Sequence, residues 1–262
     1  MSKARRPNLR RLLWHAVYEF LARTMKHEEW TFMNYGYAPV QPGDVDLKLD
    51  GGDEPDRYHI QLYHHVAGAV GLHGMDVLEV GSGRGGGAAY ICRALGPKSV
   101  TGLDLAGAAV ALSRKLHTDP QLRFVQGSSD EMPFDDESFD AVVNVESSHC
   151  YGPLERFLSE VHRVLRPGGR LLFADFRSRA EIDALRNELK ASGLALVSET
   201  VITPNVFRSL ELDNRRKLEL IERFGAPVRR YFDRFAALQG TDMFEAFRTG
   251  ENEYISCVLA KP

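Results

Sequence analysis

The chain has 262 residues, of which 44% are hydrophobic, and it carries a formal net charge of −3. This length and hydrophobic content suit one large core, or one core with an appended lid. The small net charge and the pI of about 6.3 argue against a nucleic-acid partner, which normally requires a strongly basic face.

The cysteines and the apolar runs indicate the compartment. Cys92, Cys150 and Cys257 lie far apart and form no C-x-x-C pair, which predicts free thiols in a reducing compartment. No apolar run approaches the roughly 20 residues that span a membrane. The basic N-terminus lacks the apolar stretch of a signal peptide. We therefore expect a cytoplasmic protein without a membrane span.

Residues 1–73 are expected to form an N-terminal helical and lid segment. Apolar residues at helical spacing predict an amphipathic helix over 8–25. The basic residues before it allow weak contact with a membrane surface, whereas the commoner role of such a helix is packing over a domain. The aromatic-rich residues 30–39 either belong to the core or close over a bound molecule. A second helix is predicted over 57–73.

Strands and helices alternate from Met75 onward. Nearly all-apolar strands, rich in valine and leucine, are predicted at 75–80, 99–105, 122–127, 140–146 and 170–176. Such strands are buried on both faces, as in a parallel sheet covered by helices. The helices between them are expected at 85–95, 107–117 and 153–166.

The rest of the chain completes this core and adds a second lid. A helix at 180–192 and a strand at 194–203 are predicted to end the core segment, which we assign to 74–203. Charged helical segments at roughly 208–224 and 228–238 predict a helical lid insertion over 204–250. Residues 251–262 are expected to hold the last core strand.

The functional prediction depends on a glycine-rich turn. A short apolar run ends at Glu79 and is followed by Gly81, Gly83 and Gly86, which fit G-x-G-x-x-G. Glycines permit a tight turn and a close approach of a ligand to the backbone, and the next helix begins with unpaired N–H groups. Asp104 follows about 20 residues later, as in the dinucleotide fingerprint, so an NAD-dependent oxidoreductase is one interpretation.

Glu79 favours a different nucleotide ligand. Its carboxylate is predicted at the carboxyl end of a strand, where ligands bind in open α/β sheets. A carboxylate there suits a cation better than a pyrophosphate. S-adenosylmethionine is such a cation, since it carries an ammonium and a sulfonium group and no phosphate. The alternative is that Glu79 interacts with the dipole of the next helix.

Four motifs between residues 75 and 175 resemble class I S-adenosylmethionine-dependent methyltransferases. Residues 79–85 are similar to the motif E/D-x-G-x-G-x-G, and Asp104 is similar to the ribose-binding acid after the second strand. Residues 124–134 resemble the adenine-side loop, except that Ser128 stands where the family often has an acid. Residues 164–169 match the L-K/R-P-G-G turn before the fifth strand.

This resemblance implies a fold, a cofactor and the residues that contact it. The implied fold is an α/β, Rossmann-like class I methyltransferase with a mostly parallel seven-stranded sheet, an antiparallel last strand, helices on both faces and a helical lid. The implied cofactor is S-adenosyl-L-methionine. The residues expected to bind it are Tyr37, Glu79, Gly81, Ser82, Gly83, Asp104, Leu105, Ser129, Asp130 and Asn144.

A closer resemblance extends over nearly the whole chain. Residues 32–37, 53–57, 62–64 and 144–151 are similar to the phthiotriol and phenolphthiotriol dimycocerosate methyltransferases. Fatty-acid O-methyltransferases and polyketide O-methyltransferases are similar too. The resemblance implies methyl transfer to oxygen on a hydrophobic lipid or polyketide natural product. It leaves the acceptor open, because acceptor choice depends on the variable lid segments.

His149 and Asp175 are the candidate catalytic residues. Methyl transfer to an alcohol needs a base, and histidine, with an ordinary pKa of roughly 6.5, suits that role. His149 follows the fourth predicted strand, and Asp175 ends the neighbouring fifth strand, where its carboxylate could orient the imidazole. The resemblance adds that matching residues act as a catalytic pair in related sugar O-methyltransferases. The alternative is that His149 caps the following helix.

Tyr35 and Glu146 are the candidate acceptor-binding residues, and the alternative for Glu146 is a role as a buried helix-cap partner. His64 and His65 form a second, less favoured histidine pair, because their helix needs polar residues on its outer face in any case. Neither pair has the spacing of metal ligands, so no metal is expected.

The sequence therefore predicts an S-adenosylmethionine-dependent O-methyltransferase that acts on a hydroxyl of a hydrophobic small molecule. Three alternatives stay open: carboxyl O-methylation of a fatty acid, which needs no base, an NAD-dependent oxidoreductase, and a small-molecule binder without activity. The position that is methylated and the choice between monomer and homodimer are not predicted.

Overall fold

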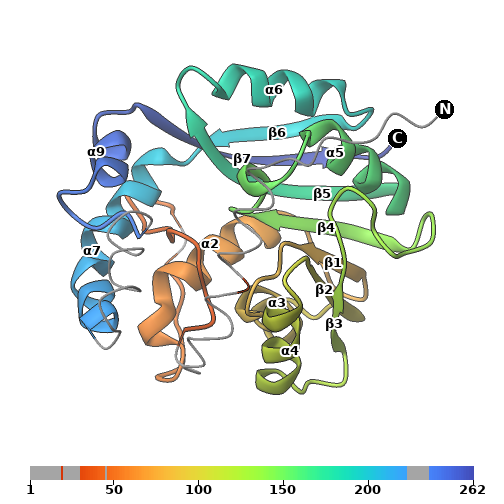
Figure 1. Ribbon diagram of the computed structural model, residues 1–262, viewed down its shortest axis with the longest axis horizontal. Helices are drawn as coiled ribbons and strands as arrows, with labels where there is room; N and C mark the ends of the chain where they lie inside the picture. Colours follow the sequence, from red (N-terminus) through yellow and green to blue (C-terminus); the bar gives the residue numbers. More distant parts are fainter. Residues whose placement is uncertain (1–18, 20–29, 45, 223–235) are drawn as a thin grey trace.

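A single seven-stranded sheet organises the chain, in the order β3-β2-β1-β4-β5-β7-β6 (Figure 1). The computed structural model describes residues 19, 30–44, 46–222 and 236–262. β7 runs antiparallel to β5 and β6, whereas the other neighbouring strands are parallel. This confirms the predicted sheet. The strands are β1 Asp76–Val80, β2 Ser99–Asp104, β3 Leu122–Gln126, β4 Phe139–Val145, β5 Leu165–Ser178, β6 Ala195–Val201 and β7 Asn252–Ala260.

Both faces of the central strands are buried. In β4, Val142 packs into one hydrophobic cluster and its neighbour Val143 packs into another. Leu171 and Leu172 of β5 divide between the two clusters in the same way. Because successive side chains of a strand point to opposite faces, this arrangement requires apolar residues at consecutive positions. The continuous apolar runs in the sequence have this origin.

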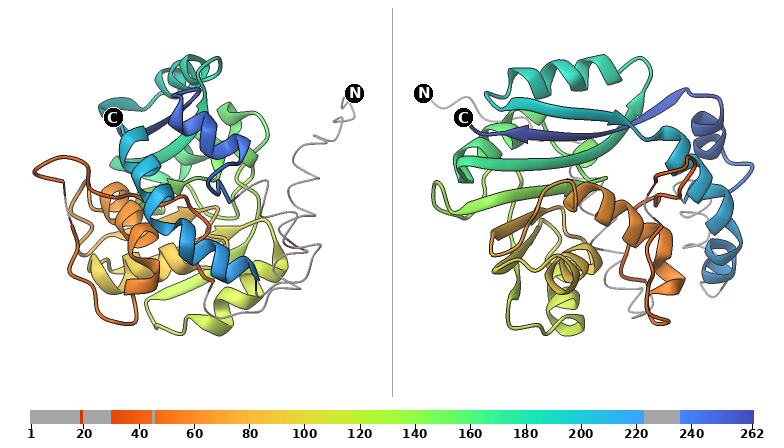
Figure 2. Two further views of the ribbon diagram at one scale, coloured as in Figure 1. Left: turned by 90° about the vertical axis from the view of Figure 1, so that its left-hand side faces the viewer. Right: turned by 180° about the vertical axis from the view of Figure 1, so that it is seen from behind.

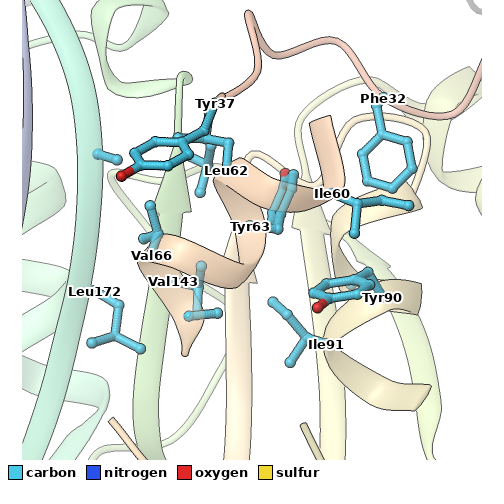
Figure 3. Close-up of a cluster of buried hydrophobic side chains, with 14 of the residues drawn as sticks. Phe32, Tyr37, Ile60, Leu62, Tyr63, Val66, Tyr90, Ile91, Val143 and Leu172 are labelled. Carbon is cyan, nitrogen blue, oxygen red and sulfur yellow. The ribbon is translucent and has the colours of Figure 1, made fainter. Parts of the chain in front are cut away.

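Helices cover the two faces. α2, α3 and α4 contribute to the cluster that contains Val143, and Figure 3 shows Tyr63 of α2 and Ile91 of α3 in it. α5 and α6 pack on the opposite face through residues that include Phe157 and Leu185. These core helices are α2 Arg57–Ala67, α3 Gly86–Ala94, α4 Gly107–Leu116, α5 Leu154–Val164 and α6 Ile182–Ala191.

Two further helices lie at the edge of the sheet where the parallel strands end. α7 (Thr203–Glu222) follows β6, and α9 (Asp242–Arg248) precedes the antiparallel β7, so both lie at this edge. They face the viewer in the left view of Figure 2. The described residues also contain two short 3-10 helices, η1 (Glu54–Asp56) and η2 (Ser148–Cys150). None of the helices in the described ranges is long and apolar enough to cross a membrane.

The lid segments differ most from the sequence predictions. The helix predicted from about residue 208 begins at Thr203 and continues for 20 residues. Most of the helix predicted over 228–238 lies outside the described residues, and its described end, 236–238, is not helical. α9 was not predicted, because its seven residues are too few to establish a helical period. The helix predicted over 8–25 lies outside the described residues except for residue 19.

Candidate active site

The glycine turn after β1 is fixed to the end of β2. The amides of Gly81 and Ser82 donate to the Leu103 carbonyl at 2.8 and 3.0 Å. Gly81 has a φ of +79°, and a Cβ there would lie 2.4 Å from Ser147 Oγ. Glycine is therefore required at this position both by the backbone conformation and by the close approach of the loop after β4.

Asp104 closes the same turn from β2. Its carboxylate accepts hydrogen bonds from the amides of Gly83 and Ala106, each at 2.8 Å. Two backbone donors hold this side chain in one orientation at the carboxyl edge of the sheet. Its position is the one expected for an acid that binds a ribose in this type of fold.

A pocket opens over this turn at the carboxyl edge of the sheet. Its walls come from the segment before α2, the turn after β1, the end of β2, and the loops after β3 and β4. The residues that line it include Trp30, Phe32, Met33, Asn34, Tyr63, Gly81, Ser82, Gly83, Arg84, Asp104, Leu105, Ser128, Ser129, Glu146, Ser147, Cys150 and Tyr151.

The structure brings most of the predicted cofactor contacts to this pocket. Those in its wall are Gly81, Ser82, Gly83, Asp104, Leu105 and Ser129. Asp130 is outside the lining, and its carboxylate accepts a short hydrogen bond from Ser128 Oγ. Asn144 lies behind the wall and donates to Ser147 Oγ at 2.8 Å and to Tyr151 OH at 2.9 Å. Asn144 therefore positions two pocket-lining side chains without lining the pocket itself.

Glu79 does not line the pocket either. Only 1% of its surface is exposed, and its carboxylate accepts a hydrogen bond from Tyr63 OH at 2.6 Å. Burial raises the pKa of Glu79 to about 7. Tyr63 lines the pocket, so the influence of Glu79 reaches the pocket through its charge and through the Tyr63 hydroxyl.

Tyr37 is not brought to the pocket. Its ring stacks on His65 with 4.6 Å between ring centroids. Burial, followed by the charge of Asp44, raises the pKa of the Tyr37 hydroxyl to about 12.

The adjacent residues Trp30 to Asn34 line the pocket instead, so the aromatic segment both joins the core and covers the site. The guanidinium of Arg84 lies 4.9 Å from the centre of the Trp30 ring.

His149 and Asp175 form a direct pair beside this pocket, although neither residue lines it. His149 Nδ1 lies 2.8 Å from Asp175 Oδ1. His149 belongs to η2, between Ser147 and Cys150, which line the pocket. The side chain of His149 is 18% exposed, whereas that of Asp175 has no exposed surface. The predicted juxtaposition of these two residues is therefore present in the structure.

Asp175 is held by several further donors. It accepts hydrogen bonds from Ser148 Oγ and from the amides of His149 and Phe176. Arg177 Nη1 lies 3.3 Å from Asp175 Oδ2. Burial is the largest single effect on Asp175 and raises its pKa. The charges of His149 and Arg177, together with the hydrogen bonds from His149 and Ser148, outweigh burial and keep the pKa well below its ordinary value. Asp175 is thus a fixed anion beside the imidazole.

The same pairing acts on His149. Burial is the largest single effect on the imidazole and lowers its pKa. The charge and the hydrogen bond of Asp175, together with Cys150, outweigh burial and raise the pKa of His149 well above its ordinary value. The ring also packs on Phe176, with 5.0 Å between centroids. The stabilising charge of Asp175 was predicted from the sequence, whereas the packing on Phe176 was not.

Tyr35 and Glu146 lie together next to this pair. The amide of Tyr35 donates to both carboxylate oxygens of Glu146, at 2.9 and 3.0 Å. Glu146 has a φ of +46°, an uncommon conformation for a residue other than glycine. Burial raises its pKa to about 8. Glu146 thus joins the loop after β4 to the segment before α2.

The second histidine pair has other partners. His64 Nδ1 lies 2.8 Å from the hydroxyl of Tyr90, and His65 stacks on Tyr37. Neither residue lines the pocket. In the part of the chain that the structure describes, no three His, Cys, Asp or Glu side chains are grouped as metal ligands.

The structure adds residues to the site that the sequence did not indicate. Ser147 and Tyr151 line the pocket, as do Tyr63, Arg84 and Cys150, and Ser148 and Arg177 hold Asp175. The segment 144–151 carries a family resemblance, but that resemblance alone gives no role to Ser147, Ser148 or Tyr151.

Comparison with known proteins decides the family. Residues 78–173 match the sequence family described as a methyltransferase domain. The chain is 43% identical, over 243 residues, to a phthiotriol/phenolphthiotriol dimycocerosates methyltransferase from Mycobacterium tuberculosis, covering 92% of this chain and 89% of the relative. The chain belongs to the class I S-adenosylmethionine-dependent methyltransferases. This methyltransferase is also 38% identical to a fatty-acid O-methyltransferase from Mycolicibacterium smegmatis, covering 94% of this chain and 89% of the relative.

Solved structures share the fold of this methyltransferase. A cyclopropane synthase from Mycobacterium tuberculosis aligns with a TM-score of 0.73 and 18% identity, covering 94% of this chain and 98% of the other. A geranyl diphosphate C-methyltransferase from Streptomyces coelicolor, solved with S-adenosyl-L-homocysteine, aligns with a TM-score of 0.67 and 18% identity, covering 95% of this chain and 98% of the other. At these identities the likeness concerns the fold.

The pocket residues fit the cofactor of this family. Gly81 leaves open backbone where any side chain would collide with Ser147. Ser82 Oγ is buried in the pocket wall and, within the described ranges, has no hydrogen-bond partner. The site also offers Asp104 as an acid for a ribose. The family therefore sets aside the dinucleotide interpretation of the glycine motif.

Proposed function

We propose that this methyltransferase transfers a methyl group from S-adenosylmethionine to a hydroxyl of a hydrophobic lipid or polyketide, with His149 as general base. The observation that carries the proposal is the 2.8 Å contact between His149 Nδ1 and the buried Asp175, in the loop whose residues Ser147 and Cys150 line the pocket. A buried carboxylate that fixes one imidazole nitrogen leaves the other nitrogen to accept a proton.

The turn residues are proposed to hold the cofactor. Asp104, fixed by two amides, would accept hydrogen bonds from the ribose hydroxyls, with Leu105 beside it. Ser129 would face the adenine, and the bare backbone at Gly81 to Gly83 would lie against the amino-acid part. Glu79, with Tyr63, would favour the positive charge of that part. When bound, S-adenosylmethionine supplies a methyl carbon that its sulfonium group makes electrophilic.

His149 is proposed to remove the proton of the acceptor hydroxyl. The O–H proton would pass to His149 Nε2 as the hydroxyl oxygen bonds to the methyl carbon and the bond from that carbon to sulfur breaks, which leaves S-adenosylhomocysteine. Asp175 keeps Nδ1 protonated and stabilises the imidazolium that results. Alignment of the acceptor within the covered pocket contributes to the rate, because an in-line displacement depends on geometry.

Aromatic side chains next to the catalytic pair support a hydrophobic acceptor. Phe176 packs against His149, and the rings of Tyr35 and Phe247 lie 5.5 and 5.3 Å from that of Phe176. The relatives named above carry lipid substrates in their names. Carboxyl O-methylation of a fatty acid is the second candidate, supported by the name of the Mycolicibacterium smegmatis relative. A carboxylate acceptor would not need a base.

The experiment that tests the proposal compares His149→Ala with wild type. Both are incubated with S-adenosylmethionine and lauryl alcohol, and formation of S-adenosylhomocysteine is followed. Removal of the base is expected to slow transfer to the alcohol by about 100-fold or more. His73→Ala, a change of an exposed histidine, is the control and should retain the wild-type rate. A rate for His149→Ala close to that of wild type would exclude the base role.

A further inference from the structure

Lys217 is a buried lysine on the lid helix α7. It lies on the inner face of that helix together with Ser209 and Asp213, and 9% of its surface is exposed. Ser209 Oγ donates to the Tyr35 carbonyl at 2.6 Å, which fixes this face of α7 against the segment that carries Tyr35. Lys217 Nζ then lies 5.8 Å from the centre of the Tyr35 ring.

The ammonium group of Lys217 has no hydrogen-bond partner among the described residues. The two carboxylates that influence it electrostatically are Asp213 and Glu146. Arg216 occupies both oxygens of Asp213, at 2.6 and 2.9 Å. The Tyr35 amide donates to both oxygens of Glu146. Lys217 therefore has three N–H donors that no described residue uses.

A buried ammonium group without hydrogen bonds carries a free-energy cost. Burial lowers the pKa of Lys217 to about 8, so it remains largely charged at neutral pH. A buried charge without hydrogen bonds opposes folding, and such groups are typically retained where a ligand uses them. Contact with the face of Tyr35 compensates part of the lost hydration but does not use the donors.

The aromatic rings connect Lys217 to the catalytic pair. The Tyr35 ring lies next to Phe176 and Phe247, at 5.5 and 5.6 Å, and Phe176 lies next to His149 at 5.0 Å. The half-buried rings of Tyr35 and Phe176, with the buried Phe247 packed against both, form an apolar surface. His149 lies next to Phe176, and Lys217 lies next to Tyr35. A lipid along this surface would meet a base at one end and a cation at the other.

We propose that Lys217 is a specificity-determining residue of the acceptor site, and that its ammonium group binds a carboxylate of the lipid acceptor. The inference rests on the proposed function, because it assumes that the acceptor hydroxyl lies at His149. It narrows the acceptor to a hydroxylated lipid that also carries an acidic group. Phe176 and Tyr35 contact the apolar part between the two, and the buried Phe247 supports both rings.

Binding measurements without turnover test this inference. Lauric acid and lauryl alcohol share one apolar chain and differ in charge, and their affinities are measured by calorimetry for wild type, Lys217→Met and Lys217→Arg. Loss of a charged hydrogen bond is expected to weaken laurate binding to Lys217→Met by about tenfold or more and to leave lauryl alcohol within about twofold. Lys217→Arg should keep most of the laurate affinity. Lys190→Met, a change of an exposed lysine on α6, should bind both probes as wild type does.

Two results would overturn the inference. One is equal weakening of both probes by Lys217→Met, which would indicate a packing role alone. The other is unchanged laurate affinity. Thermal unfolding of each variant identifies loss of the fold, and a misfolded Lys217→Met leaves Lys217→Gln to be measured in the same way. Failure of the proposed function is distinguishable, because it appears as a lack of methyl transfer whatever the affinities for the two probes.

Discussion

The Nδ1 atom of His149 lies 2.8 Å from Oδ1 of Asp175, and the carboxylate has no exposed surface. The pair joins the loop after β4 to the end of β5, two strands that are neighbours in the sheet. A charge that water cannot screen acts strongly on the imidazole. The behaviour of His149 with pH should therefore differ from that of an exposed histidine.

Methyl transfer to an alcohol should increase with pH. The base must be the free imidazole, and the charge of Asp175 raises the pKa of His149 well above its ordinary value of about 6.5. The deprotonated fraction of His149, and with it kcat/KM, should therefore increase with pH in a range above that value. Asp175→Asn should move this increase to lower pH, because the amide carries no negative charge that would stabilise the imidazolium. It should also reduce the maximal rate, because the amide does not orient the ring as the carboxylate does. A profile that is flat for the wild type between about pH 6 and 9 would contradict a base of this kind.

Arg177 should moderate the effect of Asp175. Its guanidinium lies 3.3 Å from Asp175 Oδ2 and offsets part of the carboxylate charge. In Arg177→Met that offset is lost, so the pKa of His149 should rise further and the rate profile should shift to higher pH. Nuclear magnetic resonance titration of the His149 ring measures the shift without turnover. Arg177→Lys, which keeps the charge, should titrate close to wild type, and an unmoved pKa in Arg177→Met would exclude this role.

Gly81→Ala should abolish cofactor binding, and Gly168→Ala should not. Both glycines have a φ of +79°, so both substitutions carry a similar backbone cost of about 1 kcal/mol. A Cβ at Gly81 would lie 2.4 Å from Ser147 Oγ, whereas a Cβ at Gly168 would meet no atom within 4 Å. Calorimetry with S-adenosylhomocysteine and thermal unfolding separate the collision from the strain. Equal affinities of the two variants would show that the turn does not contact the cofactor.

Glu146→Gln should change how stability depends on pH. Burial raises the pKa of Glu146 from its ordinary value of 4.5 to about 8 in the folded protein. The folded state thus holds this proton more tightly, and the stabilisation, complete below pH 4.5, is lost as the pH rises toward 8.

The variant lacks this titration. Its free energy of unfolding relative to wild type should therefore increase across that range, by at most about 1.4 kcal/mol per pH unit and less where solvent screens the group. Urea unfolding at several pH values measures the difference. Glu219→Gln, at an exposed carboxylate on α7, should run parallel to wild type. A parallel course for Glu146→Gln as well would refute the raised pKa.

Much of the fold could be predicted from the sequence, for physical reasons that the structure makes visible. A strand that is buried on both faces appears in the sequence as a continuous run of apolar residues, such as the run that ends at Val80. The structure buries both faces of these strands. The neighbourhood of His149 and Asp175 was predictable too, because the carboxyl ends of adjacent parallel strands meet at one edge of the sheet. The local hydrophobic pattern and the order of the strands are enough to predict the strands and the proximity of His149 to Asp175.

The remaining features depend on packing between distant segments. Glu79 was expected to contact the cofactor, but its side chain does not line the pocket and instead accepts a hydrogen bond from Tyr63 of α2, which does. Tyr37 was expected in the same site, but its stacking on His65 takes it elsewhere. The position of Lys217 depends on how α7 packs against Tyr35, which no local pattern encodes. Side chains on lid helices are therefore the part of the site that the sequence alone does not locate.

The central claim is that the methyl group goes to a hydroxyl oxygen that His149 deprotonates. One measurement tests it directly: a competition within ω-hydroxylauric acid, which carries both a hydroxyl and a carboxylate. The enzyme is supplied with isotopically labelled S-adenosylmethionine, and the labelled product is identified by nuclear magnetic resonance. The account predicts a methyl ether from the wild type and loss of that ether in His149→Ala. A methyl ester, formed equally well by both proteins, would contradict it.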